Sequence, residues 1–456
     1  MKLFPSSYNY SKKINQEYTL INNTLTGALD VIENYNWELA EKKSFSRLKP
    51  AILSGLIDRG YFYPEPEKEN RIFKELFKNY TKKLFSKPVR FVFCPSYSCN
   101  LACIYCFQKD LPYHPDKFMS GKVLDDSIRA AKKISEKNTG TIDSIELFGG
   151  EPLLLKSKGN VEKILKFADE EDSKIVIVTN GVLVKDFMDI LIPVKKRIGM
   201  LQITVDGPPE IHDLRREFRS GRGSFDKIEE GIELLLENNI NVHMRVNIDS
   251  TNIEHLPELY RYVSEKNWPA HPGFVIRPAL VTDHSTLDYD DTRIPEEKML
   301  EKLIKIYDKH PELENALGFH SFKPLRHLLE LLSGAPNLSP VFYNCESNIL
   351  EMDIFGPDGY IYACGESIGK PEYAIGRFSP GLEFFPGKEK LWTSRNIMSL
   401  DKCRKCKFAP ICGGGCPYSS MLIYNNNSTP VCERFQEVLD TFIDLRGEKL
   451  LKKYME

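Results

Sequence analysis

The chain has 456 residues, with 62 Lys and Arg against 64 Asp and Glu and a formal net charge of −2. This length exceeds what one hydrophobic core normally serves, so we expect two or three folded units. The near-neutral balance gives no electrostatic reason to expect a nucleic acid or a membrane surface as a partner. The first residues lack the apolar stretch of a signal peptide, and no segment is apolar for long enough to span a bilayer, so we expect a cytoplasmic protein.

The first part of the chain, residues 1–85, is expected to form a small module of its own. Polar and apolar residues alternate around a turn over Tyr8–Asn23, which predicts a β-hairpin. Short helices are expected over Leu25–Asn34, Trp37–Lys43 and Ser46–Arg59. A hairpin followed by short helices indicates a winged-helix-like module.

Residues 86–295 alternate short apolar runs with amphipathic stretches, which predicts parallel strands covered by helices. The six strands are expected at Arg90–Phe93, Ser144–Phe148, Lys174–Thr179, Leu201–Val205, Val242–Asn247 and Phe274–Arg277. Six units fit an α/β fold with a partial TIM-type barrel, (β/α)6, and a doubly wound sheet is the structural alternative. Further helices predict a bridge over residues 296–340, before a cysteine-rich domain over 341–440 and a C-terminal helix over 441–456.

Glycine-rich and polar turns follow the expected barrel strands. The turn Gly149–Pro152 follows the second strand, Thr179–Gly181 closes the third, and Asp206 with Gly207 closes the fourth. All of these positions are at the carboxyl ends of strands, where barrel enzymes build their active sites. We therefore expect the functional site on this rim.

Ten of the eleven cysteines lie in two groups, a pattern that in a reducing compartment indicates metal ligands rather than disulfides. The remaining one, Cys94, is interpreted as a buried apolar residue. The first group, Cys99, Cys103 and Cys106, has the spacing C-x3-C-x2-C. Three thiolates can hold three irons of a 4Fe–4S cluster and leave the fourth iron open to a substrate. A zinc site is the alternative, but three cysteines do not complete its four-coordinate shell.

This loop, with Tyr105 before its last cysteine and the GGEP turn Gly149–Pro152, resembles the signature of the radical S-adenosylmethionine (SAM) superfamily. The resemblance implies that SAM binds the open iron and is cleaved reductively to a 5′-deoxyadenosyl radical. Arg215 and Arg245 are candidates to neutralise the SAM carboxylate, with ordinary salt bridges as the alternative. The other implied SAM contacts are Tyr105, Gly149, Gly150, Glu151, Thr204 and Asp206.

The second group of cysteines resembles the seven-cysteine SPASM extension of that superfamily, whereas a zinc ribbon would explain only its C-x2-C-x5-C-x3-C run. The resemblance implies two auxiliary 4Fe–4S clusters, three in all. The first would use Cys345, Cys364 and Cys416, which leaves it one protein ligand short. The second would use Cys403, Cys406, Cys412 and Cys432. The missing ligand could be an open position, a carboxylate such as Glu346, or Cys94.

The resemblance indicates an oxidoreductase that modifies peptides, and a thioether crosslink is the product we expect. Carbon–carbon crosslinking is an alternative. Formylglycine formation is another, although Gly365 stands where anaerobic sulfatase maturases carry an Asp base. A non-catalytic electron-transfer protein is a third alternative.

The N-terminal module resembles the PqqD-like peptide-recognition element of peptide maturases, with a structural cap as the alternative. A precursor peptide is then the expected partner, bound by strand addition to the hairpin edge. The chemistry also requires a reductant such as flavodoxin or ferredoxin.

Overall fold

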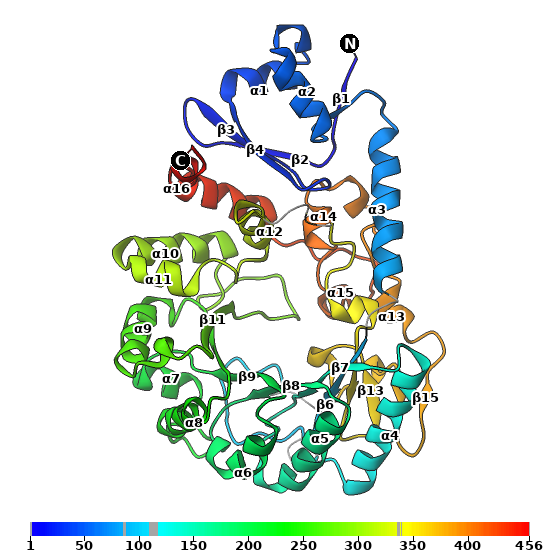
Figure 1. Ribbon diagram of the computed structural model, residues 1–456, viewed down its shortest axis with the longest axis vertical. Helices are drawn as coiled ribbons and strands as arrows, with labels where there is room; N and C mark the ends of the chain where they lie inside the picture. Colours follow the sequence, from blue (N-terminus) through cyan, green and yellow to red (C-terminus); the bar gives the residue numbers. More distant parts are fainter. Residues whose placement is uncertain (1, 85–87, 109–116, 335–337, 339, 456) are drawn as a thin grey trace.

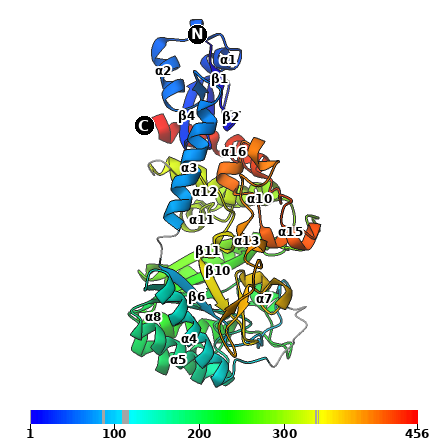
Figure 2. The same cartoon turned by 90° about the vertical axis from the view of Figure 1, so that its right-hand side faces the viewer.

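The computed structural model describes residues 2–84, 88–108, 117–334, 338 and 340–455. The predicted boundary between residues 85 and 86, part of the end of the predicted bridge, and residue 456 lie outside the described residues. Figures 1 and 2 show an elongated molecule. The large sheet lies at one end, the N-terminal module at the other, and helices together with the cysteine-rich segment lie between them (Figure 1).

Six parallel strands form the larger part of the main sheet, in the order β11–β10–β9–β8–β7–β6. Their bounds are β6 Val89–Phe93, β7 Ile142–Leu147, β8 Lys174–Thr179, β9 Ile198–Thr204, β10 Val242–Ile248 and β11 Phe274–Leu280. Helices cover one face of this sheet, namely α4 (Gly121–Lys137), α5 (Lys158–Glu170), α6 (Met188–Leu191), α8 (Phe225–Glu237) and α9 (Leu256–Glu265). The predicted α/β class and its six parallel strands are confirmed.

The cysteine-rich segment continues the same sheet. Strand β12 (Met352–Phe355) pairs in parallel with β6, and Phe355 lies opposite Phe93. Strands β13 (Tyr360–Tyr362), β14 (Gly376–Arg377) and β15 (Glu383–Phe384) extend it in antiparallel fashion to ten strands. The predicted barrel and the cysteine-rich segment are therefore joined through one hydrogen-bonded sheet.

The N-terminal module contains a three-stranded antiparallel sheet of β2 (Asn9–Lys13), β3 (Tyr18–Asn23) and β4 (Ala28–Glu33). The predicted hairpin is confirmed, but the helix predicted over Leu25–Asn34 is wrong. Gly27, at φ +73°, turns the chain, and β4 then pairs with β3 along its whole length. Helices α1 (Asn34–Glu41) and α2 (Pro50–Asp58) follow, where short helices are predicted, and the short strands β1 (Phe4–Pro5) and β5 (Phe62–Tyr63) pair beside them.

A 17-residue helix that the sequence did not predict, α3 (Lys68–Leu84), runs from this module toward the main sheet (Figure 2). Its residues Phe73 and Phe77 pack against Phe342, with ring centroids 5.5 and 5.1 Å apart. The same cluster includes Cys403 and Ala409, so the module is anchored on the cysteine-rich segment.

The bridge is helical, as predicted, with α10 (Glu296–Lys309), α11 (Pro311–Leu317) and α12 (Lys323–Leu332). The C-terminal helix α16 (Phe435–Met455) begins six residues before the predicted start and packs on α10 and α12. Tyr10 of β2 donates a hydrogen bond of 2.8 Å to Asp440 of α16. Among the described residues, no helix is both long enough and apolar enough to cross a membrane.

Candidate functional site

The first three cysteines lie together on the loop after β6. Asn180 Nδ2 approaches the Cys99 sulfur at 3.7 Å. Burial, and then the Glu151 carboxylate, raise the pKa of the Cys99 thiol to about 12, with Cys103 and Cys106 adding to the rise. Cys103 and Cys106 are near enough for their thiolate charges to act on Cys99, so the loop presents three neighbouring thiols, called here the thiol triad. Thiols with raised pKa values become thiolates when a metal replaces their protons.

The GGEP turn lies against the start of this loop. A Cβ on Gly149 would lie 2.5 Å from the Cys94 sulfur, and a Cβ on Gly150 would lie 2.2 Å from the Ser98 carbonyl oxygen. Only glycine allows so close an approach. The Glu151 N–H then donates to the Ser98 carbonyl over 2.8 Å, so the two segments are fixed to each other.

The side chain of Glu151 is 1% exposed and accepts three hydrogen bonds. The donors are the N–H of Leu153 at 2.8 Å, Thr179 Oγ1 at 2.6 Å and the N–H of Asn180 at 2.6 Å. Burial raises the pKa of this carboxyl, and the donors favour its charged form. Glu151 therefore fixes the end of β8 and the backbone of Asn180, whose side-chain amide approaches Cys99.

Tyr105 and Asp206 meet in a second buried network on the same rim. The Tyr105 hydroxyl donates to Asp206 and accepts from Arg216 over 2.6 Å and from Asn247 Nδ2 over 2.9 Å. Asp206 also accepts the N–H of Asn247 at 2.9 Å. Burial raises the pKa of Asp206, and Arg216 opposes the rise. The loop after β6 is thereby tied to the ends of β9 and β10.

Two neighbouring arginines have different roles in this network. Arg215 makes a buried, bidentate ion pair with Asp249, at 3.0 and 2.9 Å, so the salt-bridge alternative applies to it. Arg216, for which the sequence carried no signal, lies near Cys103 and opposes the rise that burial causes in the pKa of that thiol. Only the tertiary structure distinguishes the two.

Arg245 lies beside Thr204 in the paired strands β10 and β9. Its Nε donates to Asn247 Oδ1 over 2.7 Å, and burial lowers the pKa of its guanidinium. Burial raises the pKa of Glu366, opposed first by His284 and then by Arg245. Because Glu366 belongs to the cysteine-rich segment, the rim of the barrel and that segment face each other here.

The seven later cysteines form two spatial sets. In the first, burial and, after it, the thiols of Cys416 and Cys345 raise the pKa of Cys364 to about 12. In the second, burial and, after it, the thiols of Cys412, Cys406 and Cys432 raise the pKa of Cys403 to about 12. The first set is Cys345, Cys364 and Cys416, and the second is Cys403, Cys406, Cys412 and Cys432. The structure thus brings together the groups that the resemblance implied.

The run Gly413–Gly415 makes this arrangement possible, since all three residues have φ between 75° and 92°. A Cβ on the first glycine would lie 2.4 Å from the Tyr343 carbonyl oxygen, and one on the last would lie 1.9 Å from that of Val431. Tyr343 lies two residues before Cys345, and Val431 directly precedes Cys432. The glycine run therefore brings cysteines that are distant in sequence next to one another.

Two candidates for the missing fourth ligand of the first set are engaged elsewhere. Glu346 pairs with Arg90 at 2.8 Å. Cys94 is fully buried, as predicted, and its sulfur donates to the Ser96 carbonyl over 3.3 Å.

Within the described part of the chain, no three His, Cys, Asp or Glu side chains could hold a metal ion between them. A 4Fe–4S cluster makes a different demand, because each thiolate binds its own iron and the ligands need not converge on one point. Grouped, soft thiol donors beside a buried arginine suit such an anionic cluster.

The family model described as the Radical SAM superfamily matches residues 93–263. Residues 93–263 form a radical SAM domain. Such a domain uses SAM and a 4Fe–4S cluster to generate a radical that starts the reaction.

A cysteine-type anaerobic sulfatase-maturating enzyme from Clostridium perfringens is 23% identical over 335 residues, which are 70% of this chain and 86% of the relative. Fe-coproporphyrin III synthase from Methanosarcina barkeri is 23% identical over 357 residues, 72% and 83% of the two chains.

Two solved structures have a fold similar to that of this chain. Native anSMEcpe with bound AdoMet has a TM-score of 0.62 at 20% identity and covers 81% of this chain and 100% of its own. SuiB from Streptococcus suis, bound to precursor peptide SuiA, has a TM-score of 0.56 at 17% identity and covers 95% and 100%. The SuiB match extends further along this chain.

Proposed function

We propose that this protein is a radical SAM maturase that modifies a ribosomally made peptide and forms a thioether from a cysteine sulfur to a carbon atom. The observation that carries the proposal is the thiol triad of the radical SAM domain facing a second domain with two more thiol sets. Structures of this fold hold peptides, namely anSMEcpe with Cp18Cys peptide and SuiB with SuiA.

The three thiol sets are the proposed ligands of three 4Fe–4S clusters. Cys99, Cys103 and Cys106 would hold the cluster that binds SAM. The proposed SAM contacts remain Tyr105, Gly149, Gly150, Glu151, Thr204 and Asp206, with Glu151 acting through its backbone because its carboxylate is bonded to protein donors. A flavodoxin or ferredoxin would supply the electron.

The auxiliary set of Cys345, Cys364 and Cys416, which offers only three thiols, supports thioether formation in particular. Glu346 pairs with Arg90 and Cys94 is buried under the GGEP turn, so neither of these side chains completes that set. This favours a position that a substrate thiolate can occupy. Forming the thioether removes one hydrogen atom from the carbon, which the 5′-deoxyadenosyl radical would take, and one proton and one electron from the thiol. The proton would pass to solvent, and the electron would pass to the cluster that Cys345, Cys364 and Cys416 are proposed to hold.

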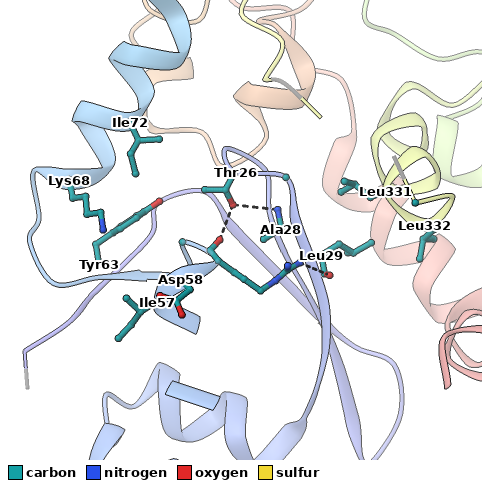
Figure 3. Close-up of a pocket in the computed structure, with 14 residues that line it drawn as sticks. Thr26, Ala28, Leu29, Ile57, Asp58, Tyr63, Lys68, Ile72, Leu331 and Leu332 are labelled. Atoms are coloured by element: carbon teal, nitrogen blue, oxygen red, sulfur yellow. Dashed lines mark hydrogen bonds between the residues drawn. The ribbon is translucent and has the colours of Figure 1, made fainter. Parts of the chain in front are cut away.

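The N-terminal module offers a site for the unmodified part of the peptide. A cavity of about 510 Å³ lies between this module, α3 and α12 (Figure 3). Thr26 and Leu29 line it from the β3–β4 region, Tyr63 from β5, Lys68 from the start of α3, and Leu331 from α12. Cavities of this size accommodate several side chains of a ligand.

Strand β4 lies at the open edge of the three-stranded sheet. Arg59 donates to the Leu29 carbonyl over 3.1 Å from outside this sheet, so the backbone groups of Leu29 point outward. Alternation along an antiparallel strand then points those of Val31 outward too. We propose that the peptide adds as a strand here, beside the cavity, rather than at the β2 edge.

Formylglycine formation is the second candidate, because several relatives are named as anaerobic sulfatase-maturating enzymes. The products separate the two candidates. Reduced enzyme with SAM is incubated with the Cys-containing peptide encoded beside the gene and with a sulfatase peptide, followed by mass spectrometry. A thioether removes two hydrogens and blocks thiol alkylation, whereas formylglycine from cysteine also exchanges sulfur for oxygen. A carbon–carbon crosslink leaves the thiol alkylable, and absence of SAM cleavage would indicate an electron carrier.

The variant Val31→Pro tests whether the peptide adds as a strand to β4. The proline removes an N–H that points out of the sheet and makes no hydrogen bond within it. Peptide binding should weaken by at least ~10-fold, about 1.4 kcal/mol. The matched control is Ser11→Pro, since the same alternation points Ser11 outward on β2, at the opposite edge. Equal peptide affinities in the two variants would contradict strand addition at β4.

A further inference from the structure

Arg395 is a buried cation in the middle of the cysteine-rich domain. It follows α13 (Lys390–Thr393) and is 2% exposed. Its guanidinium donates to five acceptors, all of them neutral. These are the carbonyls of Gly414 at 2.6 Å, Gly415 at 3.4 Å, Asn427 at 2.7 Å and Thr429 at 2.8 Å, and Ser420 Oγ at 3.3 Å.

No carboxylate among the described residues pairs with Arg395. Two other buried arginines behave differently, since Arg215 pairs with Asp249 and Arg446 pairs with Asp308 at 2.9 Å. A buried charge without a counter-charge is unfavourable by several kcal/mol. The structure therefore leaves one positive charge in this domain to be balanced by something else.

Burial lowers the pKa of the Arg395 guanidinium, and thiols from both cysteine sets oppose this shift. Ordered from the strongest influence to the weakest, they are Cys403, Cys416, Cys412 and Cys345. The carbonyls that hold the guanidinium belong to the loop between Cys412 and Cys416 and to the segment just before Cys432. The cation is thus fixed between the two sets by backbone groups that flank their own ligands.

We propose that Arg395 is the shared internal counter-ion of the two auxiliary cluster sites and raises the reduction potentials of the clusters that they hold. The inference rests on the proposed function, in that 4Fe–4S clusters occupy these sites. A thiolate-ligated cluster is anionic and gains one more negative charge when it accepts an electron. A fixed cation nearby stabilises the reduced form, and net charge and hydrogen bonding set the potentials of such clusters. Arg395 is a positioning residue that would keep the auxiliary clusters able to accept an electron.

The test compares Arg395→Gln, which removes the charge, with Arg395→Lys, which keeps it. Iron content is measured first, and midpoint potentials are then followed by electron paramagnetic resonance in the full-length reconstituted protein. Arg395→Gln should lower the reduction equilibrium constant of the auxiliary clusters by at least ~10-fold, about 59 mV for a one-electron couple. Arg395→Lys should lower it by less than half of that shift. The cluster of the radical SAM domain serves as the internal reference and should not move.

The matched control is Arg446→Gln, which removes a buried guanidinium that α16 places against Asp308 and Glu314. It should reduce stability and leave every potential unchanged. Unchanged auxiliary potentials in Arg395→Gln with full iron, or equal shifts in the Gln and Lys variants, would overturn the proposal. If Arg395→Gln retains less iron than the wild type, circular dichroism of the iron-free chains shows whether the variant has lost its fold or only its clusters. A Gln variant that is folded like the wild type before reconstitution supports the counter-ion role, whereas one that is unfolded when Arg446→Gln is folded overturns it. A wild type that binds only one cluster refutes the proposed function instead.

Discussion

Tyr97 donates a hydrogen bond of 2.8 Å to Asp358 and so ties the loop of the thiol triad to the β12–β13 turn. Tyr362 donates to the same carboxylate oxygen at 2.7 Å. Tyr97 lies two residues before Cys99, whereas Asp358 belongs to the segment that carries the other seven cysteines. Together with the pairing of β12 on β6, this bond makes the geometry of the first thiol set depend on the cysteine-rich domain.

Replacing Tyr97 by Phe should therefore disturb the loop that carries the thiol triad, in addition to lowering the stability of the protein. Loss of this partly buried hydrogen bond should reduce the free energy of unfolding by ~1 kcal/mol. We also expect slower SAM cleavage, measured as 5′-deoxyadenosine formed by the dithionite-reduced enzyme. Tyr362→Phe is the control, because it removes a bond to the same oxygen and leaves the loop attached. If both variants cleave SAM alike, the bond serves stability only.

The three thiol sets make a prediction about iron. The reconstituted wild type should hold about twelve irons per chain, four for each cluster. Replacing Cys99, Cys103 and Cys106 together by Ala should remove about four of them and abolish SAM cleavage. Replacing Cys345, Cys364 and Cys416 together should remove a different four and leave SAM cleavage measurable. About four irons in the wild type would be incompatible with the auxiliary clusters.

The parallel strands β6–β11 could be predicted because each appears as a short apolar run between amphipathic stretches of helical length. The first thiol set could be predicted because its members lie on one short loop. The division of the later cysteines is different. Cys416 lies close in sequence to Cys412, yet it belongs with Cys345 and Cys364. Only the resemblance to a family implied that pairing, since the local spacing does not.

Features that depend on distant contacts had no local signal. Strand β12 joins β6, about 260 positions earlier, and that register is decided by packing of Phe355 against Phe91 and Phe93. Likewise, the helix predicted over Leu25–Asn34 was wrong. Local preference favours a helix there, but pairing with β3 outweighs it and makes the segment strand β4. Arg395 carried no signal either, because its role comes from carbonyls far along the chain.

Glu296, at the start of α10, predicts a pH dependence of stability. Its Oε2 is buried without a hydrogen-bond partner, and burial followed by Glu433 raises its pKa to about 7. The folded state therefore binds this proton more tightly than the unfolded chain does. The resulting stabilisation is complete below the unfolded pKa of about 4.5 and is lost as the pH rises through about 7.

The variant Glu296→Gln mimics the protonated carboxyl at every pH. Between about pH 5 and about pH 8, the wild type should lose ~2–3 kcal/mol of unfolding free energy relative to this variant. Urea titrations of both proteins at several pH values, under anaerobic conditions, measure the difference. Parallel stability curves would show that Glu296 does not titrate in this range.

The last prediction concerns the surface that receives the external electron. Four cations alternate with two cysteines of the second auxiliary set, and three of these cations are exposed. The cations are Lys402, Arg404, Lys405 and Lys407, around Cys403 and Cys406. In a chain with a net charge of −2, such a local excess of positive charge favours docking of an acidic protein. The loop places that protein next to a cluster site, so it suits the proposed flavodoxin or ferredoxin.

The double variant Lys402→Glu with Lys405→Glu should therefore raise the KM for a reduced, acidic flavodoxin by at least ~10-fold, about 1.4 kcal/mol. The effect should shrink as salt increases, because exposed charges are screened. SAM cleavage driven by dithionite should be unchanged, since a small reductant needs no docking surface. Lys163→Glu with Lys166→Glu, on α5, adds the same charges on the outer face of the barrel and should leave this KM unaltered. Equal effects of the two pairs would mean that only net charge matters, and the electron would then have to enter elsewhere.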